Sequence, residues 1–302
     1  MSATTDSAEH ATRAGFIALA GRPNVGKSTL TNALVGSKVA IVSDKPQTTR
    51  RAIRAVAGGP DWQLVLVDLP GVQRPRDALT ERMQRRVESE LAGADGALMV
   101  FNAEQGIGPG DRFIAGLLER SPVPVVIAVN KLDLVDRARA VAVLQAAEQL
   151  GVAESIFPIS ARTGSGVQEL LTHLVSLLPP GHFYYEPEQR SDQSQAVLLA
   201  ELVREQILMR TREEVPHAVE VEVESISQDD GLVRIEAVAL VETESQKGIL
   251  IGSGGQMIKA IGVGARRAIE RELGGRVHLA LQVRVRRHWR GDERVLDRLG
   301  IE

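Results

Sequence analysis

Short apolar runs alternate with stretches of helical periodicity through the first 180 residues of the chain. The runs are typical of buried strands, and they lie at residues 16–20, 64–67, 97–101, 123–129 and 156–159. Apolar positions at helical spacing follow them, at residues 29–35, 110–120, 137–150 and 167–178. Strands that alternate with helices predict an α/β fold, with a mostly parallel sheet, helices on both faces and ligands at the carboxyl ends of the strands.

A proline-rich and glycine-rich stretch that begins at Pro179 interrupts this pattern and carries both tyrosines of the chain. Such a break in periodicity predicts a domain boundary. We therefore divide the chain into four segments: a disordered N-terminal tail over 1–14, an α/β domain over 15–180, a linker over 181–191 and an α+β domain over 192–302.

The second domain begins with an amphipathic helix at 194–210 and contains three strands, predicted at 217–226, 232–241 and 279–287. In the first of these strands, valines alternate with Glu220, Glu222 and Glu224. This alternation predicts a half-buried strand, with the glutamates on its polar face.

The chain has 302 residues, enough for about two domains, and no cysteine. The lack of cysteine excludes disulfides and thiol chemistry and fits a reducing cytoplasm. No apolar run is long enough to span a bilayer, and the polar N-terminus lacks the hydrophobic core of a secretory signal. From residue 245 onward, 12 Lys and Arg stand against 6 Asp and Glu, so this part carries +6 and the rest −9 of the net −3. A basic end on an acidic protein predicts a polyanionic partner, although a solvated basic face would give the same count.

The sequence GRPNVGKS, from Gly21 to Ser28, follows the first predicted strand and opens the first predicted helix. This is the context of a phosphate-binding loop, in which glycines let backbone N–H groups turn around a phosphate and the helix N-terminus favours its charge. Lys27 is then expected at the β- and γ-phosphates, and Ser28 as a ligand of Mg²⁺. The nucleotide-binding residues predicted in this loop are Gly21, Arg22, Pro23, Asn24, Val25, Gly26, Lys27, Ser28 and Thr29.

Two polar segments are candidates for sensing the γ-phosphate and the metal. In the first, either Thr48 or Thr49 can add a hydroxyl to the Mg²⁺ shell, and spacing does not decide between them. The second is Asp68-Leu69-Pro70-Gly71 at the end of a predicted strand. There the Asp68 carboxylate can hold Mg²⁺ through water, and the Gly71 N–H can face the γ-phosphate.

Val72 follows this motif, at the position where a glutamine orients the attacking water in Ras-like enzymes. A hydrocarbon side chain cannot position water, so we expect slow intrinsic hydrolysis or another catalytic device. The charged stretch 72–86 is expected to form a second, loosely helical switch.

Asn130-Lys131-Leu132-Asp133 ends a further predicted strand and is suited to a guanine base. A carboxylate at Asp133 can accept from both N1–H and the exocyclic amine of guanine, a pair of donors that adenine lacks. Lys131 can lie along the base and Asn130 can connect the loops. A backbone N–H at Ser160 or Ala161 could bond the guanine O6.

The second domain contains a GSGG sequence between an apolar stretch and a predicted helix. A GxxG loop between helices clamps a single-stranded nucleic-acid backbone, although glycines also make plain turns. Basic residues flank the loop, and the predicted RNA-binding residues are Lys247, Ile251, Gly252, Ser253, Gly254, Gly255, Lys259 and Arg266. Further along, Trp289 could either stack on a base or anchor the core.

The motifs GRPNVGKS, QTTR, DLPG, NKLD and ISA occur in the order and spacing of the Era-type GTPases, and the second half resembles a type II KH domain. The resemblance covers residues from about 15 to 301. It implies a cycle between GTP and GDP states with Mg²⁺, in which Lys27, Asp68, Gly71 and Asn24 serve catalysis. Asn24 occupies the position at which several members hold a K⁺ ion, although an asparagine there could also serve only as a turn former. The family usually has DTPG where this chain has Leu69, but Asp68 and Gly71 carry the chemistry.

The resemblance also implies partners, namely the 3′ region of 16S rRNA and the 30S ribosomal subunit. The GTP/GDP cycle would then gate rRNA binding by the KH domain during small-subunit assembly and 16S rRNA maturation. We expect a monomer in the cytoplasm, and the resemblance allows peripheral attachment to the inner face of the cell membrane. Two alternatives stay open: an RNA-binding assembly scaffold with incidental turnover, and a signalling GTPase.

Overall fold

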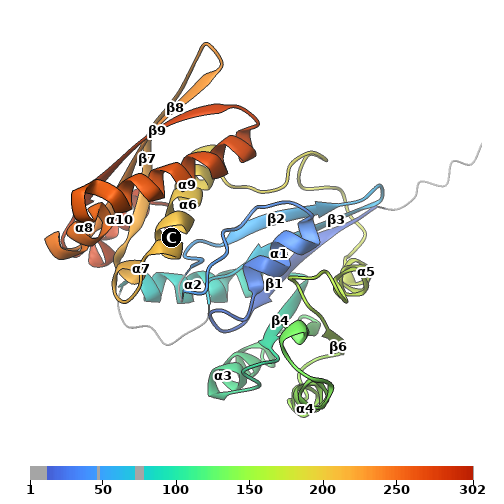
Figure 1. Cartoon of the computed structure of the whole chain (residues 1–302). Helices are drawn as coiled ribbons and strands as arrows, with labels where there is room; N and C mark the ends of the chain where they lie inside the picture. The colour runs from blue at the N-terminus through green and yellow to red at the C-terminus, as the bar shows by residue number, and fades with distance from the viewer. Residues whose placement is uncertain (1–11, 46–47, 72–77, 302) are drawn as a thin grey trace, which may run out of the picture.

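The computed structural model describes residues 12–45, 48–71 and 78–301. Within these ranges, the first domain is built on a six-stranded sheet (Figure 1). The strands are parallel except β2, which pairs antiparallel with β3 at one edge. Their order across the sheet is β2 (Ile53–Gly58), β3 (Trp62–Asp68), β1 (Arg13–Ala20), β4 (Gly96–Asn102), β5 (Val125–Asn130) and β6 (Ser155–Pro158). The predicted mostly parallel sheet is confirmed.

Helices cover both faces of this sheet. One face packs against α1 (Lys27–Val35) and α5 (Val167–Leu177). The other packs against α2 (Ala78–Ala92), α3 (Pro109–Leu118) and α4 (Arg137–Glu148). Both faces of the central strands are therefore buried in aliphatic cores, which explains why these strands read as continuous apolar runs.

One prediction for the first domain needs correction, and one strand of its sheet was missed. Strand β1 begins at Arg13, so Arg13 and Ala14 belong to the sheet and not to the predicted tail; residues 1–11 lie outside the described part. Strand β2 was not predicted, because Ile53–Gly58 is short and interrupted by Arg54. Its backbone pairs with β3 from Ile53 opposite Asp68 to Gly58 opposite Gln63.

The second domain has a three-stranded sheet in its described residues, with β8 (Leu232–Val241) between β7 (Glu220–Asp229) and β9 (Arg276–Val285). Strand β7 is antiparallel to β8 and β9 is parallel to it. The helices are α6 (Gln195–Arg210), α7 (Val215–Ala218), α8 (Glu244–Ile251), α9 (Gln256–Leu273) and α10 (Glu293–Arg298). This is the predicted α+β arrangement.

The helices cover the two faces of this sheet differently. Helices α6 and α9 bury one face through Ile235, Ala237 and Ala239 of β8. The opposite face, which includes Val238 and Leu240, is covered by Trp289, by the chain end and by α2 of the first domain. A helix of one domain thus completes the core of the other, as their neighbouring positions in Figure 1 show.

The structure changes the interpretation of four residues in this domain. His217 and Ala218 belong to helix α7, so the strand begins only at Glu220. Glu220, predicted on a polar face, is fully buried. Trp289 is also fully buried, and its Nε1–H donates to the Ala218 carbonyl oxygen at 2.8 Å, which makes it a core anchor and not a base-stacking platform.

The linker follows the edge of the first sheet. The Gln63 side chain accepts from the backbone N–H groups of Tyr184 and Tyr185, at 2.8 and 3.0 Å, and donates to the Tyr185 carbonyl. Ser191 then forms an isolated bridge with Ala55 of β2. The linker is therefore fixed against β2 and β3. Among the described residues, none of the helices has the length and apolar character needed to cross a membrane.

Candidate functional site

The loop Gly21–Gly26 connects β1 to α1 in the predicted manner. Gly26 has φ 99°, and a Cβ there would lie 2.4 Å from Asn130 Nδ2, so both conformation and space require glycine. Asn24 also has positive φ, 64°, which asparagine tolerates. Lys27 is buried at the first turn of α1, and its Nζ donates to the Gly21 carbonyl at 3.1 Å. Burial lowers the pKa of Lys27, and the nearby Asp68 opposes this shift.

The residues predicted to hold the metal lie together. Ser28 Oγ is 3.0 Å from Thr49 Oγ1, which brings two hydroxyls to the end of the loop. Asp68 ends β3, fully buried, and neither of its carboxylate oxygens accepts a hydrogen bond from the residues that the structure describes. Burial raises the pKa of Asp68, and Lys27 and then the nearby Ser28 hydroxyl oppose the rise. A buried carboxylate with unused acceptor capacity, beside two hydroxyls, is a donor set that fits Mg²⁺.

The structure distinguishes the two candidate threonines. The Thr48 hydroxyl donates to the Lys45 carbonyl at 2.6 Å, whereas Thr49 faces Ser28. Of this pair, Thr49 is therefore the residue that lies beside Ser28, and its role toward a metal stays a prediction.

Gly71 lies against the phosphate-binding loop. A Cβ at Gly71 would be 2.9 Å from the Pro23 nitrogen, so only glycine allows this approach. Leu69, the departure from the family pattern, is fully buried in the core on one face of the sheet. Val72 and the first part of the predicted second switch lie outside the described residues; the switch continues as α2.

Asn130 connects three loops at the end of β5. Its Nδ2 donates to the Val25 carbonyl at 3.0 Å, and its Oδ1 accepts from the Ala161 N–H at 2.9 Å. Lys131 Nζ donates to the Asn24 carbonyl at 2.8 Å. The Ser160 N–H donates to the Ser165 carbonyl, so both N–H groups proposed for the guanine O6 already have partners. A hydrogen bond from either N–H to the base stays a prediction, and that N–H would have to share its hydrogen between the base and its present acceptor.

Asp133, the predicted base-recognition carboxylate, is already bound by donors of its own chain. Ser160 Oγ donates to it at 2.6 Å, and Arg162 donates through Nε at 3.0 Å and also through Nη2. Hydrogen bonds from Ser160 and then Arg162 lower the pKa of Asp133. Arg162, which the sequence analysis did not single out, thus offers the same kind of paired donors that guanine would present. Its position directly after the ISA motif is the feature of the sequence from which its place beside Asp133 could have been predicted.

A cavity of about 560 Å³ lies between the phosphate-binding loop and Asp133, a size suited to a small ligand, and Asp68 is not among the residues that line it. Most of the predicted nucleotide site lines it, including Lys27, Ser28, Thr49, Lys131 and Asp133. Arg22 does not line it: its Nε lies 2.8 Å from Asp111 Oδ2, and its Nη2 donates to the Gly106 carbonyl. The Val25 side chain is buried in the core instead. Any contact from these two residues to a nucleotide would therefore come from their backbone.

The predicted RNA site lies on α8, the GSGG loop and α9. Gly252, Gly254 and Gly255 all have positive φ, at 72°, 57° and 76°, so the loop needs this composition. The remaining side chains range from half-buried to exposed: Lys247 and Ile251 are half-buried, and Ser253, Lys259 and Arg266 are exposed. The loop therefore presents backbone and cations to solvent, as phosphate binding requires.

Known families match both halves of the chain. Residues 16–131 match a family described as "50S ribosome-binding GTPase", and residues 214–290 match the KH domain family. The chain is 44% identical over 287 residues to the GTPase Era of Lacticaseibacillus paracasei, covering 95% of this chain and 96% of that protein. It is also 44% identical over 295 residues to the GTPase Era of Mycobacterium tuberculosis, covering 95% of this chain and 98% of that protein.

Two crystal structures of Era proteins superpose on both domains. One is Era in complex with MgGDPNP and nucleotides 1506–1542 of 16S ribosomal RNA, with a TM-score of 0.93 and 33% identity over 96% of this chain and 99% of that one. The other is a variant of Aquifex aeolicus Era bound to GDP·AlF₄⁻, with a TM-score of 0.92, the same identity and the same coverage.

The first prediction separates Thr48 from Thr49. Thr49→Ala removes the hydroxyl beside Ser28 and should weaken Mg²⁺-dependent binding of a GTP analogue by about tenfold, the effect of a lost metal-directed oxygen of about 1–2 kcal/mol. Thr48→Ala, the matched control, removes only a bond to the Lys45 carbonyl and should change this affinity less than threefold. Titration of both variants with and without Mg²⁺ measures the difference. The reverse order would assign the role to Thr48.

The second prediction concerns Arg162. Arg162→Ala frees the Asp133 carboxylate from an exposed ion pair that guanine must displace, so the affinity for GDP should rise by up to about fivefold. Arg137→Ala removes the same charge from an exposed position on α4 and is the matched control. Stopped-flow binding of a fluorescent guanine nucleotide measures both. A loss of affinity in the Arg162 variant would contradict the displacement and show that Arg162 supports the bound base.

Proposed function

This chain belongs to the Era family of GTPases, and from that premise we propose that its GTP/GDP cycle gates the binding of 16S rRNA by its KH domain during small-subunit assembly. The observation that carries the proposal is structural similarity. Over 96% of its length, which includes both candidate sites, this chain superposes on an Era protein that was solved in complex with RNA. That complex contains a GTP analogue with Mg²⁺ and the 3′ region of 16S rRNA.

The part of the proposal that concerns the nucleotide rests on side chains and backbone groups whose chemistry suits the phosphates, the metal and the base of GTP. Lys27 supplies a cation beside the phosphate-binding loop, and Ser28, Thr49 and Asp68 would hold Mg²⁺, which neutralises charge on the β- and γ-phosphates when bound. Gly71 approaches the loop closely enough for its backbone to face the γ-phosphate. Asp133 would select guanine by accepting two N–H donors.

The RNA half rests on the GSGG loop and its cations. Its exposed backbone can approach phosphates, while Lys247, Lys259 and Arg266 supply charge on the flanking helices. The family description of the first domain names the 50S subunit, whereas the Era complex holds RNA of the small subunit. We follow the complex, because its match spans both domains and the description covers only residues 16–131.

Two other functions make different predictions for cells. In an assembly scaffold with incidental turnover, Lys27→Ala would abolish GTP binding and leave cellular function unchanged. In a signalling GTPase, crosslinking at Lys247, Lys259 or Arg266 would recover no RNA. A cytoplasmic location accompanies a ribosomal partner, while peripheral membrane attachment and the monomeric state stay predictions.

Crosslinking of RNA to the full chain, followed by sequencing, tests the proposed function. We expect the 3′ region of 16S rRNA, with more of it in the presence of a nonhydrolysable GTP analogue than with GDP. Substituting Ser253→Asp together with Gly254→Asp puts two carboxylates in the phosphate path and should reduce the crosslinks by at least about tenfold.

The matched control for this double variant is Gly231→Asp, in the turn between β7 and β8. Gly231 also has positive φ, 71°, and open space around its Cβ position. This variant should keep the crosslinks. Equal crosslinking with the two nucleotides would contradict gating, and recovery of RNA other than 16S rRNA would contradict the partner.

The use of K⁺ forms a separate prediction. It is supported by the position of Asn24, whose Nδ2 donates to the Asp44 carbonyl at 2.6 Å in the segment that precedes Thr49. Amide and carbonyl oxygens are suitable ligands for K⁺, and a cation there would offset charge that develops on the phosphates. GTP hydrolysis should therefore be at least about tenfold faster in K⁺ than in Na⁺. Asn24→Gly, which permits the same positive φ, should remove the difference. Equal rates for the unmodified chain in the two salts would refute this role.

A further inference from the structure

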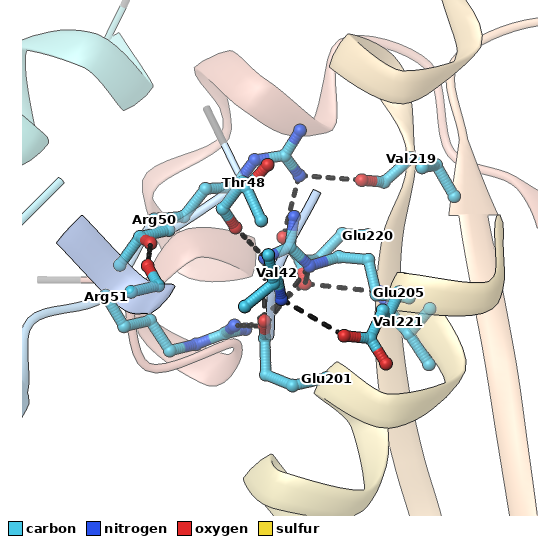
Figure 2. Close-up of polar contacts among 12 residues, drawn as sticks. Val42, Thr48, Arg50, Arg51, Glu201, Glu205, Val219, Glu220 and Val221 are labelled. Atoms are coloured by element: carbon cyan, nitrogen blue, oxygen red, sulfur yellow. Dashed lines mark hydrogen bonds and ion pairs between the residues drawn. The ribbon is translucent and has the colours of Figure 1, made fainter. Parts of the chain in front are cut away.

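The segment that carries Thr49 is attached to the second domain on both sides of that residue. On one side, the fully buried Arg204 of α6 donates through Nη2 to the Thr48 carbonyl oxygen. On the other side, Arg50 Nη1 lies 2.8 Å from Glu220 Oε2 and also donates to the Val219 carbonyl at 2.6 Å. Figure 2 shows these groups converging from the first domain and from the start of β7. The backbone around Thr49 is thus held from outside its own domain.

Glu220 is the centre of this attachment. Besides Arg50, its carboxylate is approached by Arg51 at 3.4 Å and by Arg204 at 3.7 Å. Glu201 closes the cluster, with 2.7 Å contacts to Arg51 Nη1 and to Arg204 Nη2 (Figure 2). Three guanidinium groups and two carboxylates are therefore packed at the domain boundary, and removing either carboxylate would leave positive charges facing one another.

A second attachment begins before Thr48. Glu205 of α6 accepts from the Val42 N–H at 3.0 Å and from Lys38 Nζ at 2.5 Å. The neighbouring Ile41 packs inside the core of the second domain, against residues of α6. The segment that carries Thr49 is therefore attached at Ile41 and Val42 as well as around Thr49.

The helix that follows the Asp68–Gly71 motif is also bound to the second domain. Leu79 and Met83 of α2 are buried in one cluster with Trp289 and the C-terminal residues. Arg82 Nη1 contacts Asp297 at 2.7 Å, and its Nη2 contacts Glu293 at 3.0 Å. The segment that carries Thr49 and the helix that follows the Asp68–Gly71 motif thus both pack against the KH domain.

We propose that Arg50, Arg204 and Glu220 are positioning residues, which hold Thr49 beside Ser28 only while the KH domain is docked. Thr49 serves the nucleotide mainly when Mg²⁺ and a γ-phosphate are bound. Docking of the KH domain then raises the affinity for GTP relative to GDP. Because binding free energies are linked, GTP must favour docking by the same factor. This inference requires the guanine-nucleotide site but no RNA partner.

The test uses the full chain with Glu220→Gln, which leaves the three arginines of the cluster with one fewer counter-charge. We expect the ratio of GTP-analogue affinity to GDP affinity to fall about tenfold, within the usual range for coupled sites. The loss should come from the GTP analogue, with GDP affinity nearly unchanged. Glu224→Gln is the matched control, because Glu224 lies on the same strand, is exposed and pairs with Arg284 of the same domain.

Trp289 provides an independent readout of docking. It is one of two tryptophans in the chain, and the Arg50 guanidinium lies 5.5 Å from its ring centre. In a Trp62→Phe background, its emission reports whether the first domain covers it. The GTP analogue should shift this emission to the blue relative to GDP, and Glu220→Gln should abolish the nucleotide-dependent shift.

Each outcome decides the proposal. An unchanged affinity ratio in Glu220→Gln, or a ratio that rises, would overturn it, and so would an equal fall in the Glu224→Gln control. If Glu220→Gln fails to fold by circular dichroism, Arg50→Met and Arg50→Lys take its place: the first should lower the ratio about tenfold and the second, which keeps the charge, by less. Equal ratios in these two variants and the unmodified chain would again overturn the proposal. RNA is absent from all these measurements, so a failure of the proposed rRNA partner would leave their result intact.

Discussion

Glu220 is a carboxylate that the fold withdraws fully from water at the boundary between two domains. Burial alone would raise its pKa, but Arg51, Arg204 and Arg50 together outweigh this and lower the pKa to about 2. Since the pKa is lowered from 4.5, the cluster stabilises the docked arrangement fully above that pH and loses its effect as the pH falls towards 2. In the other direction, burial lowers the pKa of Arg50 to about 10, with Glu220 opposing the shift. Glu220 and Arg50 are therefore both charged throughout the neutral range.

In our proposal the nucleotide site depends on this cluster, because one of its residues, Thr49, is held in place from outside the first domain. Lys27, Ser28 and Asp68 are held by the sheet and by the first turn of α1, which are parts of one continuous core. Thr49 belongs to a segment without helix or strand of its own, and its neighbours are bonded to the second domain. The rigid half of the proposed metal site is thus built by the sheet, while the residue of the adjustable half is held by contacts from the second domain. This division suits an enzyme that must distinguish GTP from GDP, since only the adjustable half needs to respond.

The parts of the site that could be predicted are those whose chemistry lies in neighbouring residues. The phosphate-binding loop and the Asp68–Gly71 motif carry their strand, turn and ligand in one short stretch, and the GSGG loop does the same for the second domain. Glu220 could not be interpreted in this way, because the partner Arg50 lies 170 residues earlier and the alternation with valines indicated an exposed face. Trp289 was undecided for the same reason: whether it stacks or packs depends on Leu79 and Met83 of the other domain. Local patterns therefore predicted both sites but not the contact between the two domains.

The chemistry of the boundary also bears on whether it can open. Well-packed apolar residues of similar volume are often as stabilising as a buried ion cluster, or more so, because ions lose their hydration on burial. An apolar surface, however, would favour one closed state and would aggregate when exposed. Arg50, Arg51 and Glu201 would regain hydration if the domains separated. The hydration free energy that these charged groups lose on burial would then be recovered, which lowers the free-energy cost of opening. The smaller apolar contact of Leu79 and Met83 with the Trp289 cluster lies on the other switch segment, where it adds attraction without directional bonds. A boundary made this way fixes one specific docked arrangement and exposes mainly charged groups when the domains separate. A contact between domains that depends on the γ-phosphate of the nucleotide requires both properties.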